Sequence, residues 1–116
     1  MSPALTLWSL DEVVLVSSVY AIAEAERNLD DVELRARLYG LLRKVEVVAE
    51  PPTAAELPKG IQLPGKDVPI MLAATHARCT HLLTGDLKHF GPLLNRIVKG
   101  VRVSTIRDYL NERRAG

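Results

Sequence analysis

The chain of 116 residues lacks the features that mark several protein classes. It has one cysteine, Cys79, so an internal disulfide is excluded, which is typical of proteins in a reducing cytosol. No apolar run approaches the roughly 18 residues that a membrane-spanning helix needs. The N-terminus also lacks the basic and then apolar profile of a signal peptide. The sequence therefore predicts a cytoplasmic protein that does not bind membranes.

The net charge is small, and aromatic side chains are few. The formal net charge is +1, which argues against a surface that is basic throughout but allows a local basic patch. Aromatic residues make up 4% of the chain and are scattered, so they are too few to form a platform for base stacking. The hydrophobic content of 47% and the charged content of 25% are ordinary globular values. At this length we expect one domain, residues 1–116.

Strand-like and helix-like segments alternate along the chain. Short β-branched and apolar runs predict strands at residues 13–16, 45–48, 81–84 and 101–103. Helical spacing predicts helices at residues 18–29 and 31–43, a helix from Asp67, and a closing helix that Ser104 caps, followed by a polar tail at residues 111–116. Residues 51–65 contain four prolines and two glycines and are interpreted as a loop. This alternation predicts an α/β domain with a mainly parallel sheet.

Two carboxylates fall where an α/β sheet binds ligands. Asp67 opens an apolar helix, and Asp86 follows the strand at residues 81–84 after a glycine that lets the chain turn. The carboxyl ends of parallel strands and the adjacent helix starts line one crevice, so we expect both acids there. Converging carboxylates repel each other unless a cation lies between them, and Mg²⁺ or Mn²⁺ suits oxygen ligands. Taken singly, each acid also fits a structural role, as a helix cap or a turn residue.

Three separated motifs resemble the PIN-domain family, in the same order and at suitable distances. They are LVSSVYAIAEAERNL at residues 15–29, KDVPI at residues 66–70 and LTGDLKHF at residues 83–90, and the resemblance extends over about residues 8–109. It implies a three-layer α/β/α fold with a mainly parallel sheet. It also implies a metal-dependent nuclease, chiefly a ribonuclease, and the family includes the toxins of many bacterial toxin–antitoxin pairs. RNA and an antitoxin protein are therefore the expected partners.

The resemblance assigns roles to individual residues. Carried over by position, Glu24, Asp67 and Asp86 match three family acids that bind Mg²⁺ or Mn²⁺ and activate water for phosphodiester cleavage. Three side chains near these acids in the sequence could contact RNA phosphates, and they are Lys66, Lys88 and His89. As an alternative, Lys88 and His89 are solvated loop residues.

The chain departs from the family pattern at its N-terminus. The family begins with a strand that ends in an Asp and lies in the middle of the sheet, whereas residues 1–7 contain no acid and resemble the helix that follows that strand. A further acid after Asp86 is also absent. We therefore expect a PIN-like domain that is N-terminally truncated relative to the family and cleaves RNA weakly or not at all. The alternative is a catalytically inert PIN-like module that binds protein or RNA; a receiver-like or phosphatase-like domain is disfavoured because it would carry paired acids on its first strand.

The missing strand would leave a gap between residues 13–16 and residues 81–84. Both segments would then expose unpaired backbone groups along apolar edges, which invites pairing. Three outcomes could relieve this gap: the two strands close on each other, residues 2–7 enter it, or another chain supplies a strand. The N-terminal segment contains Pro3 and continues as a helix, so we expect self-association, with a homodimer favoured over a monomer.

Overall fold

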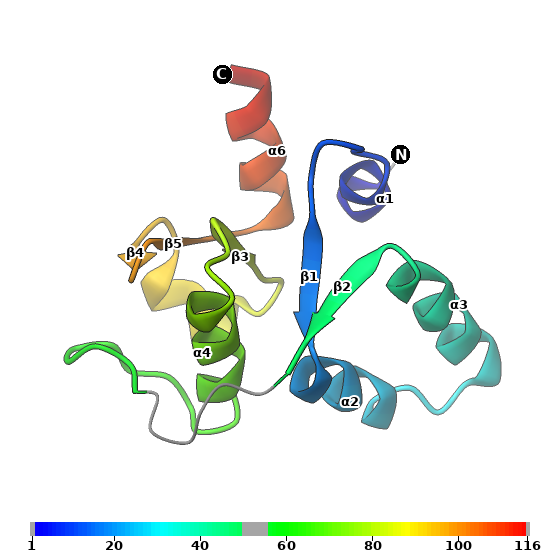
Figure 1. The fold of residues 1–116 in the computed structure, drawn as a ribbon, viewed down its shortest axis with the longest axis horizontal. Helices are drawn as coiled ribbons and strands as arrows, with labels where there is room; N and C mark the ends of the chain where they lie inside the picture. Colours follow the sequence, from blue (N-terminus) through cyan, green and yellow to red (C-terminus); the bar gives the residue numbers. More distant parts are fainter. Residues whose placement is uncertain (1, 50–55, 116) are drawn as a thin grey trace.

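The computed structural model describes residues 2–49 and 56–115 and has a mixed α/β architecture (Figure 1). In chain order the elements are α1 (Pro3–Trp8), β1 (Leu15–Ser18), α2 (Val19–Arg27), α3 (Val32–Leu42), β2 (Val45–Val48), α4 (Val68–His76), β3 (His81–Leu83), α5 (Leu87–Phe90), the 3₁₀ helix η1 (Gly91–Leu93), β4 (Ile97–Val98), β5 (Val101–Ser104) and α6 (Ile106–Ala115). The predicted α/β class is confirmed. None of the helices in the described ranges is long and apolar enough to cross a membrane.

The described strands form two small sheets instead of one continuous sheet. Strand β1 pairs in parallel with β2, with Leu15 opposite Val45. Strand β5 lies between β3, to which it is parallel, and β4, to which it is antiparallel. The expected parallel pairings are therefore present, but β1 and β3 are not hydrogen-bonded to each other within the described residues.

The helices that follow β1 begin and end close to the predicted positions. Ser18 caps α2, because its Oγ accepts a hydrogen bond from the backbone N–H of Ala21 at 3.0 Å. Asp31 caps α3 in the same way, through the backbone N–H of Glu33 at 2.7 Å. Of the predicted loop, residues 51–55 lie outside the described residues, and residues 56–65 contain no helix or strand, as expected.

Three predicted boundaries are wrong. The first strand lies at Leu15–Ser18 and not at residues 13–16, because its partner β2 pairs with those four residues. The closing helix is capped by Thr105, whose Oγ1 accepts from the backbone N–H of Asp108 at 3.0 Å, while Ser104 is buried in β5. That helix continues to Ala115, so residues 111–115 are helical and not a loose tail.

The hydrophobic core lies on one side of the molecule. Its buried members come from α4 and the segments after it, and they are Met71, Ala74, Phe90, Leu93, Val98, Val101 and Val103. Among residues 2–49, by contrast, only Leu7 and Ser18 are buried, and neither α2 nor α3 has a buried residue. The half of the chain that contains β1 and β2 therefore has no filled core of its own.

The gap expected between the two strands is not closed by the described part of the chain. Residues 3–8 form α1, which packs against α6, and so do not enter the gap as a strand. The other internal solution, direct pairing of β1 with β3, is absent from the described residues as well. The radius of gyration is 14.3 Å, slightly above the about 13.4 Å expected for a filled domain of this length.

Candidate metal centre

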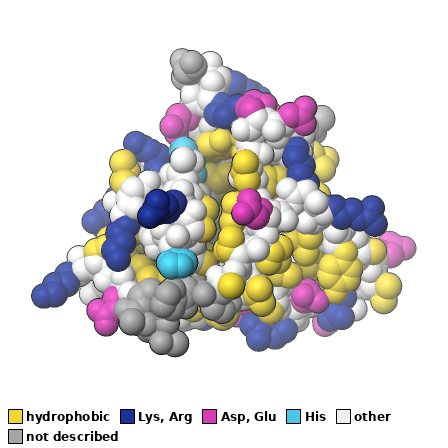
Figure 2. Space-filling model, viewed as in Figure 1, with side chains coloured by type: hydrophobic (Ala, Val, Ile, Leu, Met, Phe, Trp, Pro, Cys, Tyr) yellow, Lys and Arg dark blue, Asp and Glu magenta, His cyan; other side chains and the backbone are white. Residues whose placement is uncertain are grey.

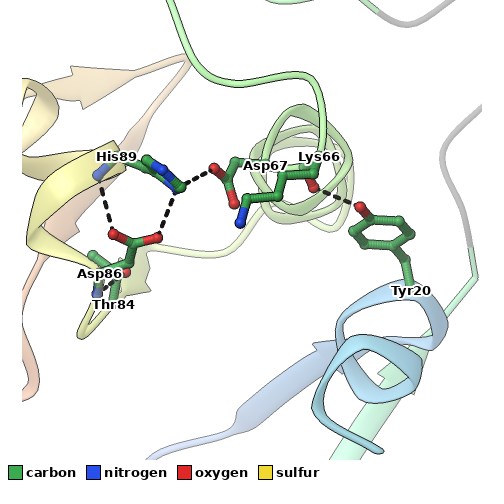
Figure 3. A network of polar contacts seen from close by, with 6 residues as sticks. All are labelled: Tyr20, Lys66, Asp67, Thr84, Asp86 and His89. Carbon is green, nitrogen blue, oxygen red and sulfur yellow. Dashed lines mark hydrogen bonds and ion pairs between the residues drawn. The ribbon is translucent and has the colours of Figure 1, made fainter. Parts of the chain in front are cut away.

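The two acids predicted to share a crevice do lie close together. Asp67 directly precedes α4 and Asp86 directly precedes α5, one turn after β3 ends (Figure 3). Between them lies His89, on the first turn of α5. Its Nδ1 atom is 2.9 Å from Oδ2 of Asp67 and 2.9 Å from Oδ2 of Asp86. One ligand atom from each of the three residues lies within 4.8 Å of the others.

The contacts of His89 in this group have the distances of ion pairs but not the angles of hydrogen bonds. Both contacts of the imidazole are short enough for ion pairs, yet Nδ1 of His89 and Oδ2 of Asp67 are buried and have no hydrogen-bond partner of acceptable geometry among the described residues. A hydrogen bond weakens steeply when it is misaligned, so these contacts do not act as hydrogen bonds. The two buried atoms are therefore close to each other without a hydrogen bond, and leaving a buried polar group without one costs about 1–3 kcal/mol.

Asp86 has a local structural role in addition to its place in the group. Its Oδ1 accepts from the backbone N–H of His89 at 3.0 Å, which caps α5, and its own N–H donates to Oγ1 of Thr84 at 3.0 Å. The hydrogen bond from the His89 backbone is the main cause that lowers the pKa of Asp86; burial opposes this, and the charge of His89 adds to it. The carboxylate is thus held in its charged form and leaves Oδ2 free to face the imidazole.

Asp67 has no corresponding local role. It occupies the cap position of α4, but its side chain makes no cap hydrogen bond. It is only 6% exposed, and Nδ1 of His89 lies 2.9 Å from its Oδ2. Since the simple capping role is not realised, the burial of Asp67 is compensated by this imidazole or by a cation bound by Oδ2.

The structure does not bring Glu24 into this group. Glu24 lies on α2 and forms an ion pair with Arg27, with 3.0 Å between Oε1 and the guanidinium nitrogen. The residue of α2 that reaches the group is Tyr20, whose Oη donates to the carbonyl oxygen of Lys66 at 2.6 Å (Figure 3). Burial raises the pKa of Tyr20, and the negative charges of Glu24 and Asp67 raise it further, so both acids lie near this phenol.

Two of the three side chains predicted to contact phosphates are lysines next to members of the group in the sequence. Lys66 and Lys88 are exposed, and the charge of Lys66 is a minor cause of the lowered pKa of Asp86. His89, predicted as a phosphate contact, lies instead between the two carboxylates. The spacing Asp86-x-x-His89 could have indicated this, because residues three apart on a helical turn lie on the same face.

The three side chains could hold a divalent cation. In octahedral coordination with bonds of about 2.1 Å, neighbouring ligand atoms are about 3 Å apart, close to the 2.9 Å contacts of the imidazole. The two carboxylates would neutralise the charge of such an ion. The imidazole nitrogen favours Mn²⁺ over Mg²⁺, because nitrogen ligands suit transition metals better than hard cations.

Comparison with known proteins gives no match: no family model, no curated protein and no solved structure is similar enough to this chain to assign it. The chemistry of the Asp67–Asp86–His89 group and the motifs in the sequence therefore carry the functional interpretation.

Proposed function

We propose that the chain is a metal-dependent ribonuclease of the PIN type, with a three-layer α/β/α arrangement that is incomplete at the centre of its sheet. The observation that supports this proposal best is the group of Asp67, Asp86 and His89, whose ligand atoms lie within 4.8 Å of one another, two of them buried and without a hydrogen bond in the described residues. Two of these three residues are the acids that the motifs KDVPI and LTGDLKHF carry over from the family.

Each residue of the group would have a distinct part in the reaction. Oδ2 of Asp67 and Oδ2 of Asp86 would hold Mn²⁺ or Mg²⁺, with Nδ1 of His89 as the third ligand. Such an ion lowers the pKa of bound water and stabilises charge on the phosphoryl oxygens. Lys66 and Lys88, which are exposed beside the group, would bind the phosphates on either side of the cleaved bond.

The rate of cleavage is expected to be low. Ligands of a metal site act as a unit, so a site that lacks one family acid should lose orders of magnitude in turnover. The ion pair between Glu24 and Arg27 holds a further acid outside the group, and this favours the second candidate function, an inert PIN-like module that binds RNA or protein. A toxin with an antitoxin partner is the biological role that would suit the active form.

Cleavage of a fluorescent single-stranded RNA with Mn²⁺, with Mg²⁺ and with a chelator distinguishes these functions. We expect slow cleavage that depends on Mn²⁺ and falls at least about 100-fold in Asp67→Asn, because a buried metal ligand has been removed. Asp108→Asn, a change of an exposed acid on α6, serves as the matched control and should cleave at the wild-type rate. Equal cleavage by Asp67→Asn would contradict the proposal, and Mn²⁺ binding without cleavage would favour the inert module.

A further inference from the structure

A large groove lies between the two sheets. It has a volume of about 970 Å³ and runs along Val13–Ser18 on one side and Thr80–Leu83 on the other. Strand β1 uses one edge to pair with β2, and β3 uses one edge to pair with β5. Within the described residues the two opposite edges have no strand partner. The groove is therefore bordered on two sides by strand edges with free hydrogen-bonding groups.

The two strands that border the groove run in the same direction. Tyr20, just after β1, donates to the carbonyl oxygen of Lys66, and Asp86, just after β3, contacts His89, which lies 2.9 Å from Asp67. Both strands therefore end beside the same Lys66–Asp67 segment, as Figure 3 shows for the residues that follow them. Two parallel edges that face each other have the geometry of neighbours of one inserted strand.

The walls of the groove are mainly apolar. Helices α2 and α4 contribute small and branched side chains, which include Ile22, Ala25, Ile70 and Ala73. Strand β3 contributes Leu82, and helix α6 contributes Tyr109. Figure 2 shows hydrophobic side chains exposed along the middle of the face, between the two halves of the molecule. A strand that is covered on both faces must itself be apolar at successive positions.

The volume matches a short peptide strand. A strand spacing of about 4.8 Å, a layer spacing of about 10 Å and a rise of about 3.3 Å give about 160 Å³ per residue. The groove of about 970 Å³ thus has room for roughly six residues. This length is sufficient to span the four residues of β1.

The side chains around the groove also lack a covering layer. Val14 is 73% exposed and Val16 is 36% exposed, although both belong to the apolar run that leads into and forms β1. Helices α2 and α3 also contain no buried residue. The groove therefore lies where a hydrophobic core for the half of the chain with β1 and β2 would be expected. Filling it would remove apolar surface from water, which favours binding.

We infer that the groove binds an extended apolar strand of another polypeptide, about six residues long, between β1 and β3. A second copy of this chain is a poorer occupant, because each of its strands in the described residues is already paired within a sheet. Nucleic acid is also disfavoured, because most of the lining is aliphatic, the basic side chains Arg78 and Arg113 are matched by the acids Glu12 and Glu46, and the rings that line it in the described residues are Trp8, His81 and Tyr109. The partner is thus recognised by backbone pairing along two edges and by apolar side chains on both faces.

A synthetic peptide of alternating Val and Ile, six residues long and with one Lys at each end, tests this inference on the full chain. Trp8, the one tryptophan, and Cys79, the one cysteine, both line the groove and report on its occupancy. We expect a saturable change in Trp8 fluorescence and a slower reaction of the Cys79 thiol with a disulfide reagent. The control peptide has the same sequence with alternate backbone nitrogens methylated, which removes the N–H donors that face one edge.

Two matched variants locate the binding site. Val14→Asp places a charge in the groove, whereas Val32→Asp places one on α3 outside it, and both residues are exposed, at 73% and 83%, so both variants should fold. We expect Val14→Asp to weaken peptide binding at least about tenfold, because an unpaired charge would be buried, and Val32→Asp to leave binding unchanged. Equal binding of the methylated peptide, equal binding by Val14→Asp, or no binding of the unmethylated peptide would overturn the inference. So would a stable dimer in which Cys79 is already protected without peptide, since a second copy would then fill the groove.

Discussion

At the scale of single residues, Asp67 and Asp86, both predicted to lie at one crevice, have different local roles. Asp86 caps α5, while Asp67 is buried at the start of α4 without capping it. The sequence could place both at one crevice, because strand ends and helix starts are read from local patterns. It could not show that the Asp67 side chain turns away from its helix, or that Glu24 pairs with Arg27, since both depend on how distant elements pack.

Binding of a divalent cation should stabilise the fold. We expect Mn²⁺ to raise the melting temperature by several degrees, because an ion at 100 times its Kd adds about 2.7 kcal/mol to the free energy of unfolding. Asp67→Asn and Asp86→Asn should abolish this rise, which a thermal melt with and without Mn²⁺ measures. Asn is also a good helix cap, so Asp86→Asn removes the metal ligand without removing the cap of α5.

The same melts separate two assignments of the metal ligands. The position of Glu24 in its ion pair predicts that Glu24→Gln responds to Mn²⁺ like the wild type. If Glu24→Gln lost the response, Glu24 would be a metal ligand, as the family resemblance implies, and the ligand set inferred from the distances would be wrong. An undiminished response in Asp86→Asn would remove Asp86 from the site.

At the scale of elements, helices with a long local sequence pattern could be predicted, whereas a short strand that depends on a turn could not. Helices α2 and α3 were predicted within two residues at each end, because their caps and apolar spacing lie within the segment itself. Strand β4, only two residues long, was missed. It exists because Lys99 and Gly100, with φ values of 48° and 85°, turn the chain back so that Val98 pairs with Val101. Two positive φ values are typical of a tight hairpin turn.

Alanine at two glycines should therefore change stability in opposite directions. A Cβ atom meets nothing within 4 Å at either Gly100 or Gly40, so only backbone conformation distinguishes them. Gly100→Ala should lower the free energy of unfolding by about 1–2 kcal/mol, because its φ of +85° is strained for a residue with a side chain. Gly40→Ala, in helix α3, should raise it by about 0.5–1 kcal/mol. Urea unfolding measures both values, and a stable Gly100→Ala would show that the hairpin turn is not held in this conformation.

At the scale of the whole molecule, the chain has two unequal halves. The half built from α4 to β5 has a buried core around Met71 and Val103, whereas Ser18 is the one buried residue from β1 to β2. The resemblance to the PIN family predicted a gap between these halves, and β1 and β3 are not paired with each other in the described residues. It did not predict that the gap stays open as a groove, because an empty slot in a sheet is expected to collapse.

The open groove predicts how the purified chain behaves alone. Each free edge of β1 and β3 can pair with an edge strand of another copy without that copy filling the groove, so we expect weak, reversible self-association that increases over the micromolar range and includes the homodimer predicted from the sequence. The strand peptide should compete for the same edges and return the chain to a monomer, while the methylated peptide should not. Sedimentation velocity at several concentrations, with and without each peptide, measures this. A monomer at all concentrations, with a sharp cooperative melt and no peptide present, would mean that the exposed edges are stable without a partner.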